Sequence, residues 1–263
     1  MTRRRFYAPP EQFAPGGATV ELTREETLHL KNVLRLKAGD EAFVFDGVGN
    51  EYACIIAGES GGRGRVETAT LEVRGRVEPQ RAESPLDLTL GVALLKGEKF
   101  DTVVQKATEL GVWRIVPVVT KRADVRLQRE GREATAARLA RWRRLALEAA
   151  KQSGRARLPE VCAPVGFASF LETEAGAGGV AEQRLLFTER GGRGLLETVR
   201  EWPTRPAKLT ALVGAEGGWE TEELARAAGA GWLSITFGGR VLRAETAAII
   251  VAGLLQHLCG DLV

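Results

Sequence analysis

The stretch Lys208-Leu-Thr-Ala-Leu-Val-Gly-Ala-Glu-Gly-Gly-Trp219 decides the fold of this chain, together with Leu233-Ser-Ile-Thr-Phe-Gly-Gly-Arg-Val-Leu-Arg-Ala-Glu-Thr-Ala247. In each stretch an apolar run leads into a turn interrupted by glycines. Short apolar runs before turn signals are typical of buried strands, and glycine lets a backbone turn tightly or approach a ligand. Each stretch therefore predicts strand, turn and helix, the arrangement that forms ligand sites at the carboxyl ends of strands in α/β sheets.

Acidic residues distinguish the first turn from a phosphate-binding loop. Glu216 lies among the glycines, and Glu220, Glu222 and Glu223 follow it. A phosphate site at a helix start offers bare N–H groups, and acids there would repel the ligand. The charge therefore favours a ligand with positive charge, such as the sulfonium and ammonium groups of S-adenosylmethionine. The glycines alone are equally consistent with a turn that only relieves the backbone.

The second turn carries a cation in an unusual position. Glu245 lies near the expected helix start, where the helix dipole favours an acid whatever its function. Arg243 lies there too, and the same dipole disfavours it. A partner is therefore expected for Arg243, and an anionic substrate group or Glu216 would suit. We interpret Arg243 as a functional residue.

Composition limits the classes of function. A chain of 263 residues with 44% hydrophobic and 27% charged residues is typical of globular domains, and its net charge of +3 gives no strong field toward nucleic acid. Three scattered cysteines and two histidines predict no metal site and a reducing compartment. The longest apolar run, Ala247 to Leu255, is too short to span a bilayer. With no secretory signal at the start, we expect a cytoplasmic protein without a membrane partner.

Residues 1–78 predict a small β-rich domain. A capping-box spacing from Thr23 to Glu26 opens a short helix that runs to Leu34. Alternating and apolar runs predict strands at 42–45, 51–56 and 71–77, with a hairpin tip at 61–64. Short strands with one helix suggest a small barrel.

The segment 79–85 is polar and flanked by prolines, so we place the domain boundary there. Beyond it, apolar runs alternate with helical periodicity. Strands are predicted at 86–95, 113–119 and 184–187 in addition to the two described above, and helices at 100–110, 134–152 and 246–258. Strands separated by helices predict a mostly parallel sheet over residues 79–263.

These motifs, in this order, resemble the RsmE family of SPOUT methyltransferases, which methylate N(3) of a uridine in 16S ribosomal RNA of the small subunit. The resemblance covers essentially the whole chain. It is carried by Arg4-Arg-Phe-Tyr7, His29-Leu-Lys-Asn-Val-Leu-Arg35, Phe45-Asp-Gly-Val-Gly-Asn-Glu-Tyr52, Lys106-Ala-Thr-Glu-Leu-Gly111, Gln152-Ser-Gly-Arg155, Gly214-Ala-Glu-Gly-Gly218 and Leu242-Arg-Ala-Glu-Thr-Ala247.

The resemblance implies an α/β architecture in two parts. Residues 1–78 would form a PUA-like RNA-binding β-barrel. Residues 79–263 would form a SPOUT domain whose C-terminal trefoil knot binds S-adenosyl-L-methionine, in a homodimer. The knot rests on the resemblance alone, because true knots are rare among folds. A strongly apolar C-terminal helix is consistent with a core or a subunit interface.

The resemblance also implies site residues, with Arg243 as the catalytic candidate and no metal. The expected cofactor-binding residues are Phe187, Thr188, Glu189, Val213, Gly214, Glu216, Gly217, Gly218, Phe237, Gly238, Val241, Leu242, Glu245, Thr246 and Ala247. Basic residues at the ends of elements are the expected RNA-binding set, namely Arg3, Arg4, Arg5, Arg35, Lys96, Lys106, Arg122 and Arg155.

Three positions depart from the family pattern. Ala215 and Gly239 stand where proline is usual, and Lys151 stands where glutamate is common.

Two other functions are also consistent with the sequence. One is a SPOUT enzyme that methylates a ribose 2′-oxygen, and the other is a non-catalytic RNA-binding assembly factor. Identifying the methylated atom in the product RNA would distinguish the ribose-methylating enzyme. A titration with S-adenosylmethionine would distinguish the assembly factor, which would not bind the methyl donor.

Overall fold

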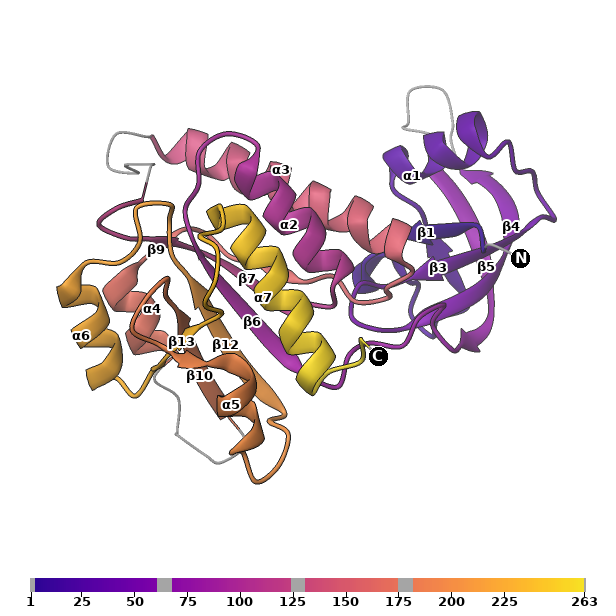
Figure 1. The fold of residues 1–263 in the computed structure, drawn as a ribbon. Helices are drawn as coiled ribbons and strands as arrows, with labels where there is room; N and C mark the ends of the chain where they lie inside the picture. The colour runs from indigo at the N-terminus through magenta and orange to yellow at the C-terminus, as the bar shows by residue number, and fades with distance from the viewer. Residues whose placement is uncertain (1–2, 61–67, 124–130, 175–181, 263) are drawn as a thin grey trace. The chain divides into compact units, whose positions relative to one another are not determined.

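The computed structural model describes residues 3–60, 68–123, 131–174 and 182–262 of the chain (Figure 1). The hairpin tip predicted at 61–64 lies outside these residues. The chain divides into two compact units. The first comprises Met1–Glu83 and Ala150–Leu158, and the second comprises Ser84–Ala149 and Pro159–Val263.

The first unit is built on a sheet that, in the described residues, has the strand order β1-β3-β4-β5-β2. The strands are β1 (Arg5–Tyr7), β2 (Thr19–Glu21), β3 (Glu41–Phe45), β4 (Glu51–Ser60) and β5 (Thr68–Val77). β1 pairs parallel to β3, and the other pairs are antiparallel. The register between β4 and β5 shifts twice, and such bulges let a sheet curl around its own core. The three predicted strands are confirmed.

The helix of this unit follows its capping signal. α1 (Arg24–Leu28) begins after Thr23, whose hydroxyl accepts the N–H of Glu26 at 3.3 Å. The chain then continues through one π-helical segment, η2 (His29–Val33), as far as the sequence predicted. A 3-10 turn, η1 (Pro10–Gln12), precedes β2. The Glu26 carboxylate accepts the N–H of Tyr7 and the ammonium of Lys151, at 3.4 and 2.8 Å.

The second unit contains a parallel sheet, with the order β11-β13-β10-β12-β6-β7-β8 in the described chain and β9 paired to β7. Its strands are β6 (Asp87–Ala93), β7 (Arg114–Val119), β8 (Glu160–Val161), β9 (Val165–Gly166), β10 (Glu182–Phe187), β11 (Arg193–Gly194), β12 (Lys208–Val213) and β13 (Leu233–Thr236). The predicted parallel sheet is confirmed, and the additional strands are two-residue pairings too short to leave a periodic pattern.

Helices cover both faces of this sheet (Figure 1). They are α2 (Lys99–Glu109), α3 (Arg132–Ser153), α4 (Phe167–Thr173), α5 (Leu195–Arg200), α6 (Thr221–Gly229) and α7 (Ala244–Cys259). Apolar residues of α2, α3, α5 and α7 form one core with the sheet, and those of α4 and α6 form another on the opposite face. A methyl group at Gly91 of β6 would lie 2.7 Å from the Phe170 ring of α4, so only glycine permits this packing.

The first break between the units falls within the segment 79–85 where the sequence placed the boundary, but the membership of a later segment differs from the prediction. The first unit extends to Glu83 and takes in Ala150–Leu158, which the sequence placed in the second domain. Glu83 is the physical reason. Its carboxylate accepts two bonds from the Arg155 guanidinium, at 3.0 and 2.8 Å, and the N–H groups of Ala156 and Arg157. These partners lie more than 70 positions apart, so no local pattern reveals them.

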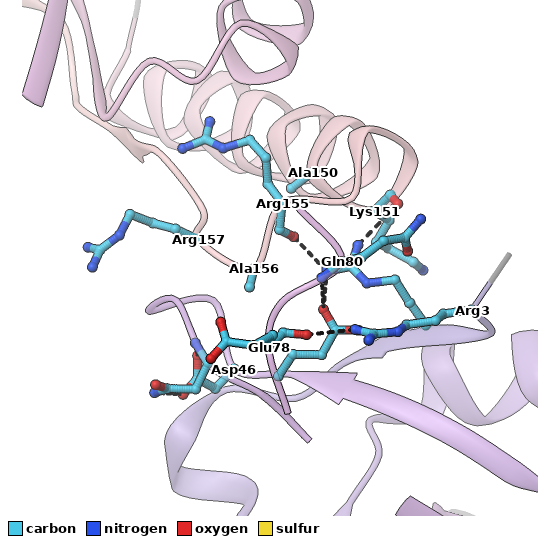
Figure 2. Close-up of polar contacts among 12 residues, drawn as sticks. Arg3, Asp46, Glu78, Gln80, Ala150, Lys151, Arg155, Ala156 and Arg157 are labelled. Carbon is cyan, nitrogen blue, oxygen red and sulfur yellow. Dashed lines mark hydrogen bonds and ion pairs between the residues drawn. The ribbon is translucent and has the colours of Figure 1, made fainter. Parts of the chain in front are cut away.

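A second carboxylate, the buried one of Glu51, takes part in the polar contacts between the first strands and the segment 150–158. Figure 2 shows three residues of this network, Arg3, Gln80 and Arg155. Glu51 is fully buried and accepts bonds from Arg3 and Arg5 at 3.0 and 3.1 Å, and from the N–H of Gln80 at 3.0 Å. Arg5 also donates to the carbonyl of Arg155 at 2.8 Å. Glu51 therefore compensates a buried cation and connects β1, β4 and the segment 150–158.

We expect Glu51→Gln to lower the free energy of unfolding by about 3–5 kcal/mol, because it leaves the buried Arg5 guanidinium without a counter-charge. Urea denaturation measures the change. The matched control is Glu72→Gln, whose partner Arg74 is 59% exposed and whose loss should cost at most about 1 kcal/mol. Equal, small changes in both variants would contradict the role given to Glu51.

Candidate functional site

The second unit has a cavity of about 310 Å³ at the carboxyl ends of β10, β12 and β13. Because β10 pairs parallel to both neighbours, the turns that follow the three strands meet at one edge of the sheet. The predicted cofactor residues that line the cavity are Phe187, Thr188, Glu189, Val213, Gly214, Gly217, Gly218, Phe237, Gly238, Val241, Leu242 and Ala247. The structure thus brings most of the expected set together.

The first glycine turn is packed against a buried indole. A side chain at Gly214 would bring its Cβ to 3.0 Å from the ring of Trp219. The Trp219 N–H donates to the carbonyl of Phe187 at 2.8 Å, so the indole ties this turn to the end of β10. Trp219 lines the cavity and was not among the predicted residues, although it closes the quoted motif.

The second glycine turn depends on left-handed backbone. Gly238 and Gly239 have φ values of 67° and 72°, and the Gly238 N–H donates to the Thr236 hydroxyl at 3.2 Å. Proline cannot adopt a positive φ. The glycine that replaces the usual proline at 239 is therefore required by the turn this chain forms, and it lines the cavity. Ala215, the other departure, also lines the cavity and is buried.

The turn after β10 is held to β13 by its own polar groups. The Thr188 N–H donates to the carbonyl of Ile235 at 2.8 Å, and the Thr188 hydroxyl donates to the carbonyl of Arg190 at 3.0 Å. The rings of Phe187 and Phe237 pack with their centroids 5.2 Å apart. The cavity walls on this side are thus fixed by backbone and aromatic contacts.

The acidic residues of the first turn are ion-paired or hydrogen-bonded within this chain, which corrects the argument made from their charge. Glu216 is ion-paired with Lys99 and does not line the cavity. The hydrogen bond from Lys99 lowers the pKa of the Glu216 carboxyl. Glu222 is paired with Lys121, and Glu223 accepts the N–H groups of Lys121 and Glu220 at 3.0 Å each. These carboxylates therefore do not by themselves select a positively charged ligand.

Arg122, which the sequence analysis assigned to RNA binding, lines the cavity. Its Nη1 donates to the carbonyl of Gly217 at 2.7 Å, and its Nε donates to the Glu220 carboxylate at 2.8 Å. The hydrogen bond with Glu220 raises the pKa of Arg122 and lowers that of Glu220. A Cβ at Gly217 would lie 3.2 Å from the Cβ of Arg122. Arg122 therefore braces the glycine turn from one side.

Arg243 is the N-cap residue of α7, and the helix begins two residues earlier than predicted. Its side chain is exposed and, within the described part of the chain, forms no hydrogen bond or ion pair. It lies near the Lys99–Glu216 pair, because its charge also contributes to the lowered pKa of Glu216. Arg243, Glu245 and Thr246 do not line the cavity, although Leu242, Ala244 and Ala247 around them do. One Glu245 oxygen is buried without a partner.

The expected RNA-binding residues divide by burial. Arg5 and Arg155 are only 7% and 4% exposed and are ion-paired with Glu51 and Glu83, so the structure does not support a phosphate contact by either residue. Arg3 and Lys106 are also ion-paired, with Glu51 and Glu109. Arg122 is paired with Glu220, as described above, and the last three are exposed and form no side-chain hydrogen bond or ion pair among the described residues: Arg4, Arg35 and Lys96.

Further cavity residues were not predicted. They are Arg190, Ala215, Trp219, Leu224, Thr236, Gly239, Arg240 and Ala244, most of which are immediate neighbours of predicted positions. In the described ranges, no group of His, Cys, Asp or Glu is placed to hold a metal ion. No helix among those residues has the length and apolarity needed to cross a bilayer.

Comparisons with known proteins agree with this architecture. Residues 82–256 match the family model of an RNA methyltransferase domain, and residues 22–68 match that of an RNA methyltransferase PUA domain. The chain is 33% identical to the ribosomal RNA small subunit methyltransferase E of Synechocystis over 97% of this chain and 77% of that protein. The Bacillus subtilis protein of the same name is 26% identical over 97% of this chain and 96% of its own length.

A solved structure shows the same fold over the full length of both chains. It is the ribosomal RNA small subunit methyltransferase E of Neisseria gonorrhoeae bound to S-adenosyl methionine, with 29% identity and a TM-score of 0.82. The family model, the identities and the shared fold agree with the motifs quoted from both ends of the sequence. This chain belongs to the ribosomal RNA small subunit methyltransferase E family, the RsmE family of SPOUT methyltransferases.

Proposed function

We propose that this protein transfers a methyl group from S-adenosylmethionine to N(3) of a uridine in 16S ribosomal RNA. The observation that carries the proposal is the cavity formed by the turns after β10, β12 and β13. A structural relative that shares the fold over its whole length is bound to S-adenosyl methionine. We infer from the same family that the active species is a homodimer in the cytoplasm, and that the C-terminal part of the second unit is a trefoil knot.

The cavity fits the proposed cofactor in size and lining. Its volume of about 310 Å³ lies at the lower end of the range for small-molecule sites. The walls combine apolar side chains, such as Phe187 and Leu242, with glycine backbone that a ligand can approach closely. The unpartnered, buried oxygen of Glu245 offers an acceptor next to the cavity. The proposed cofactor-binding residues are the predicted ones that line the cavity together with Glu245, and Trp219 and Arg122 are added as supports of the glycine turn.

The proposed methyl transfer requires the protein to stabilise negative charge on the uracil ring and does not require a covalent bond between protein and RNA. The sulfonium of the bound cofactor supplies a reactive methyl group. Uracil N(3) must give up its proton to a base or to solvent, and the ring then carries negative charge until it takes the methyl group. Arg243 is exposed, unpaired among the described residues and fixed at the N-cap of α7, so its guanidinium is suited to stabilise that charge. The protein's other task is to hold the base and the methyl donor in reacting geometry.

The experiment that tests this function is methylation of 16S rRNA from a strain lacking the gene, followed by mapping of the methylated atom. We expect N(3)-methyluridine from the unmodified protein. We expect Gly217→Val to abolish cofactor binding, because the new side chain displaces Arg122 and enters the cavity wall. Calorimetry measures that affinity, and Gly229→Val, whose Cβ meets open space, is the size-matched control.

Two results would contradict the proposal in different ways. Methyl groups on ribose 2′-oxygens would show a different reaction on the same fold. Absence of cofactor binding by the unmodified protein would favour a non-catalytic assembly factor. Unchanged affinity in Gly217→Val would disprove only the placement of the cofactor.

Arg243→Ala should lower turnover by roughly 10²–10³, the scale for losing one group that stabilises an anion in the transition state. Cofactor affinity should change much less, and Arg243→Lys should restore little activity because an ammonium does not reproduce the guanidinium fork. Single-turnover methylation and cofactor titration separate the two effects. The control is Arg226→Ala, which removes an exposed arginine paired with Glu172. Normal turnover with weakened cofactor binding would reassign Arg243 to cofactor holding.

The proposed homodimer has a candidate face on α7. Ile250 and Leu254 are 37% and 36% exposed on a helix whose opposite side is buried in the core. We expect light scattering of the unmodified protein to give twice the 28.4 kDa mass of one chain, and Leu254→Glu to give a monomer. Leu196→Glu, at a 49% exposed position on α5, is the control that should stay dimeric. A single-chain mass at micromolar concentrations for the unmodified protein would refute the dimer.

A further inference from the structure

The cations near the cavity fall into two groups. Three are ion-paired: Lys99 with Glu216, Arg122 with Glu220, and Arg193 with Glu201. Arg190 and Arg240 differ from these. Both are exposed, both line the cavity, and neither forms a hydrogen bond by side chain or an ion pair with any residue that the structure describes. Their guanidinium groups therefore have their full hydrogen-bonding capacity available for a ligand.

The fold places these two arginines on neighbouring turns. Arg190 follows β10 and Arg240 follows β13, and the two strands pair parallel with Phe187 opposite Ile235. The backbone under Arg190 is fixed, since the Thr188 hydroxyl donates to its carbonyl at 3.0 Å and the Thr236 hydroxyl donates to the carbonyl of Glu189 at 3.4 Å. The two free cations thus stand on anchored turns at the same cavity.

Exposed apolar side chains lie beside them. Phe237 is 38% exposed and Val241 is 69% exposed, on either side of Arg240 in sequence, and both line the cavity. Proteins that bind single-stranded RNA combine aromatic or apolar side chains, on which bases stack, with arginines, which bind phosphates. A guanidinium also matches a phosphate through two parallel hydrogen bonds.

We propose that Arg190 and Arg240 bind backbone phosphates of the RNA next to the nucleotide that enters the cavity. This inference rests on the proposed function and assigns its substrate contact in the second unit. The nearby paired arginines cannot take this role without breaking an existing ion pair. The two free arginines lose only water, so a phosphate contact adds to affinity.

The test measures binding of unmethylated 16S rRNA by filter retention at salt concentrations between about 50 and 200 mM. Over such a range, the slope of log affinity against log salt reports the number of phosphate contacts. Arg190→Ala and Arg240→Ala should each weaken binding several-fold and reduce the slope of log affinity against log salt by about 0.7, the value for one contact to a single strand. Lysine at either position should restore most of the slope, because an ammonium also binds phosphate as a point charge.

Arg193→Ala is the matched control. Arg193 lies three positions from Arg190, is ion-paired with Glu201 at 2.6 Å and does not line the cavity. Its loss should leave both the affinity for rRNA and the slope unchanged. Thermal melting of each variant should match the unmodified protein, since the altered side chains are exposed.

Three outcomes would overturn the inference or the function separately. Unchanged affinity and slope in Arg190→Ala and Arg240→Ala would overturn the phosphate contact. Unchanged slopes with a weakened affinity for S-adenosylmethionine would show that the arginines bind the cofactor's carboxylate, and would overturn it as well. Reduced slopes in the two alanine variants, together with an unmodified protein that transfers no methyl group, would support the phosphate contact and overturn the proposed function.

Discussion

Parallel pairing of β10 with both β12 and β13 is the constraint on which the rest of the site depends. Parallel strands end at the same edge of a sheet, so turns from distant parts of the sequence become neighbours. Each turn alone is an ordinary glycine-containing connection. Together they enclose one cavity, which Trp219 stabilises by bonding across from the first glycine turn to the end of β10. The site is therefore a consequence of strand order and strand direction.

The sequence predicted this arrangement because the signals are local. The apolar runs at 208–213 and 233–236, and the glycines after them, determine strand and turn without reference to other residues. The charges around the site were less predictable. Glu216 suggested a positively charged ligand, yet its partner Lys99 lies 117 positions away at the start of α2. Whether an acid is free or neutralised is decided by such distant contacts, which periodicity does not reveal.

The same limit explains the arginines of the first unit. In the sequence Arg5 looks like part of a basic surface, but in the structure it is buried and donates hydrogen bonds to Glu51 and to the carbonyl of Arg155. Charge in the sequence therefore indicates neither exposure nor function. The cost of burying ions explains why these groups are so completely paired, since an unpaired buried guanidinium would destabilise the fold. Glu83 is paired in the same way and joins residues 155–157 to the first unit, which is why this unit includes a segment that the sequence placed in the second domain.

Pairing also offers a way to separate structural from functional cations. In the described part of the second unit, Lys99, Arg122 and Arg193 each have a carboxylate partner, so their charge is already used within the protein. Arg190, Arg240 and Arg243 have none there, although carboxylates are plentiful nearby. Folding alone gives no reason to keep exposed, unpaired cations in the lining of one cavity, as for Arg190 and Arg240, or beside it, as for Arg243, because like charges repel one another at low salt. A negatively charged ligand that binds at the cavity removes this cost, and an RNA strand with a reacting uracil has such charge both along its backbone and on its ring.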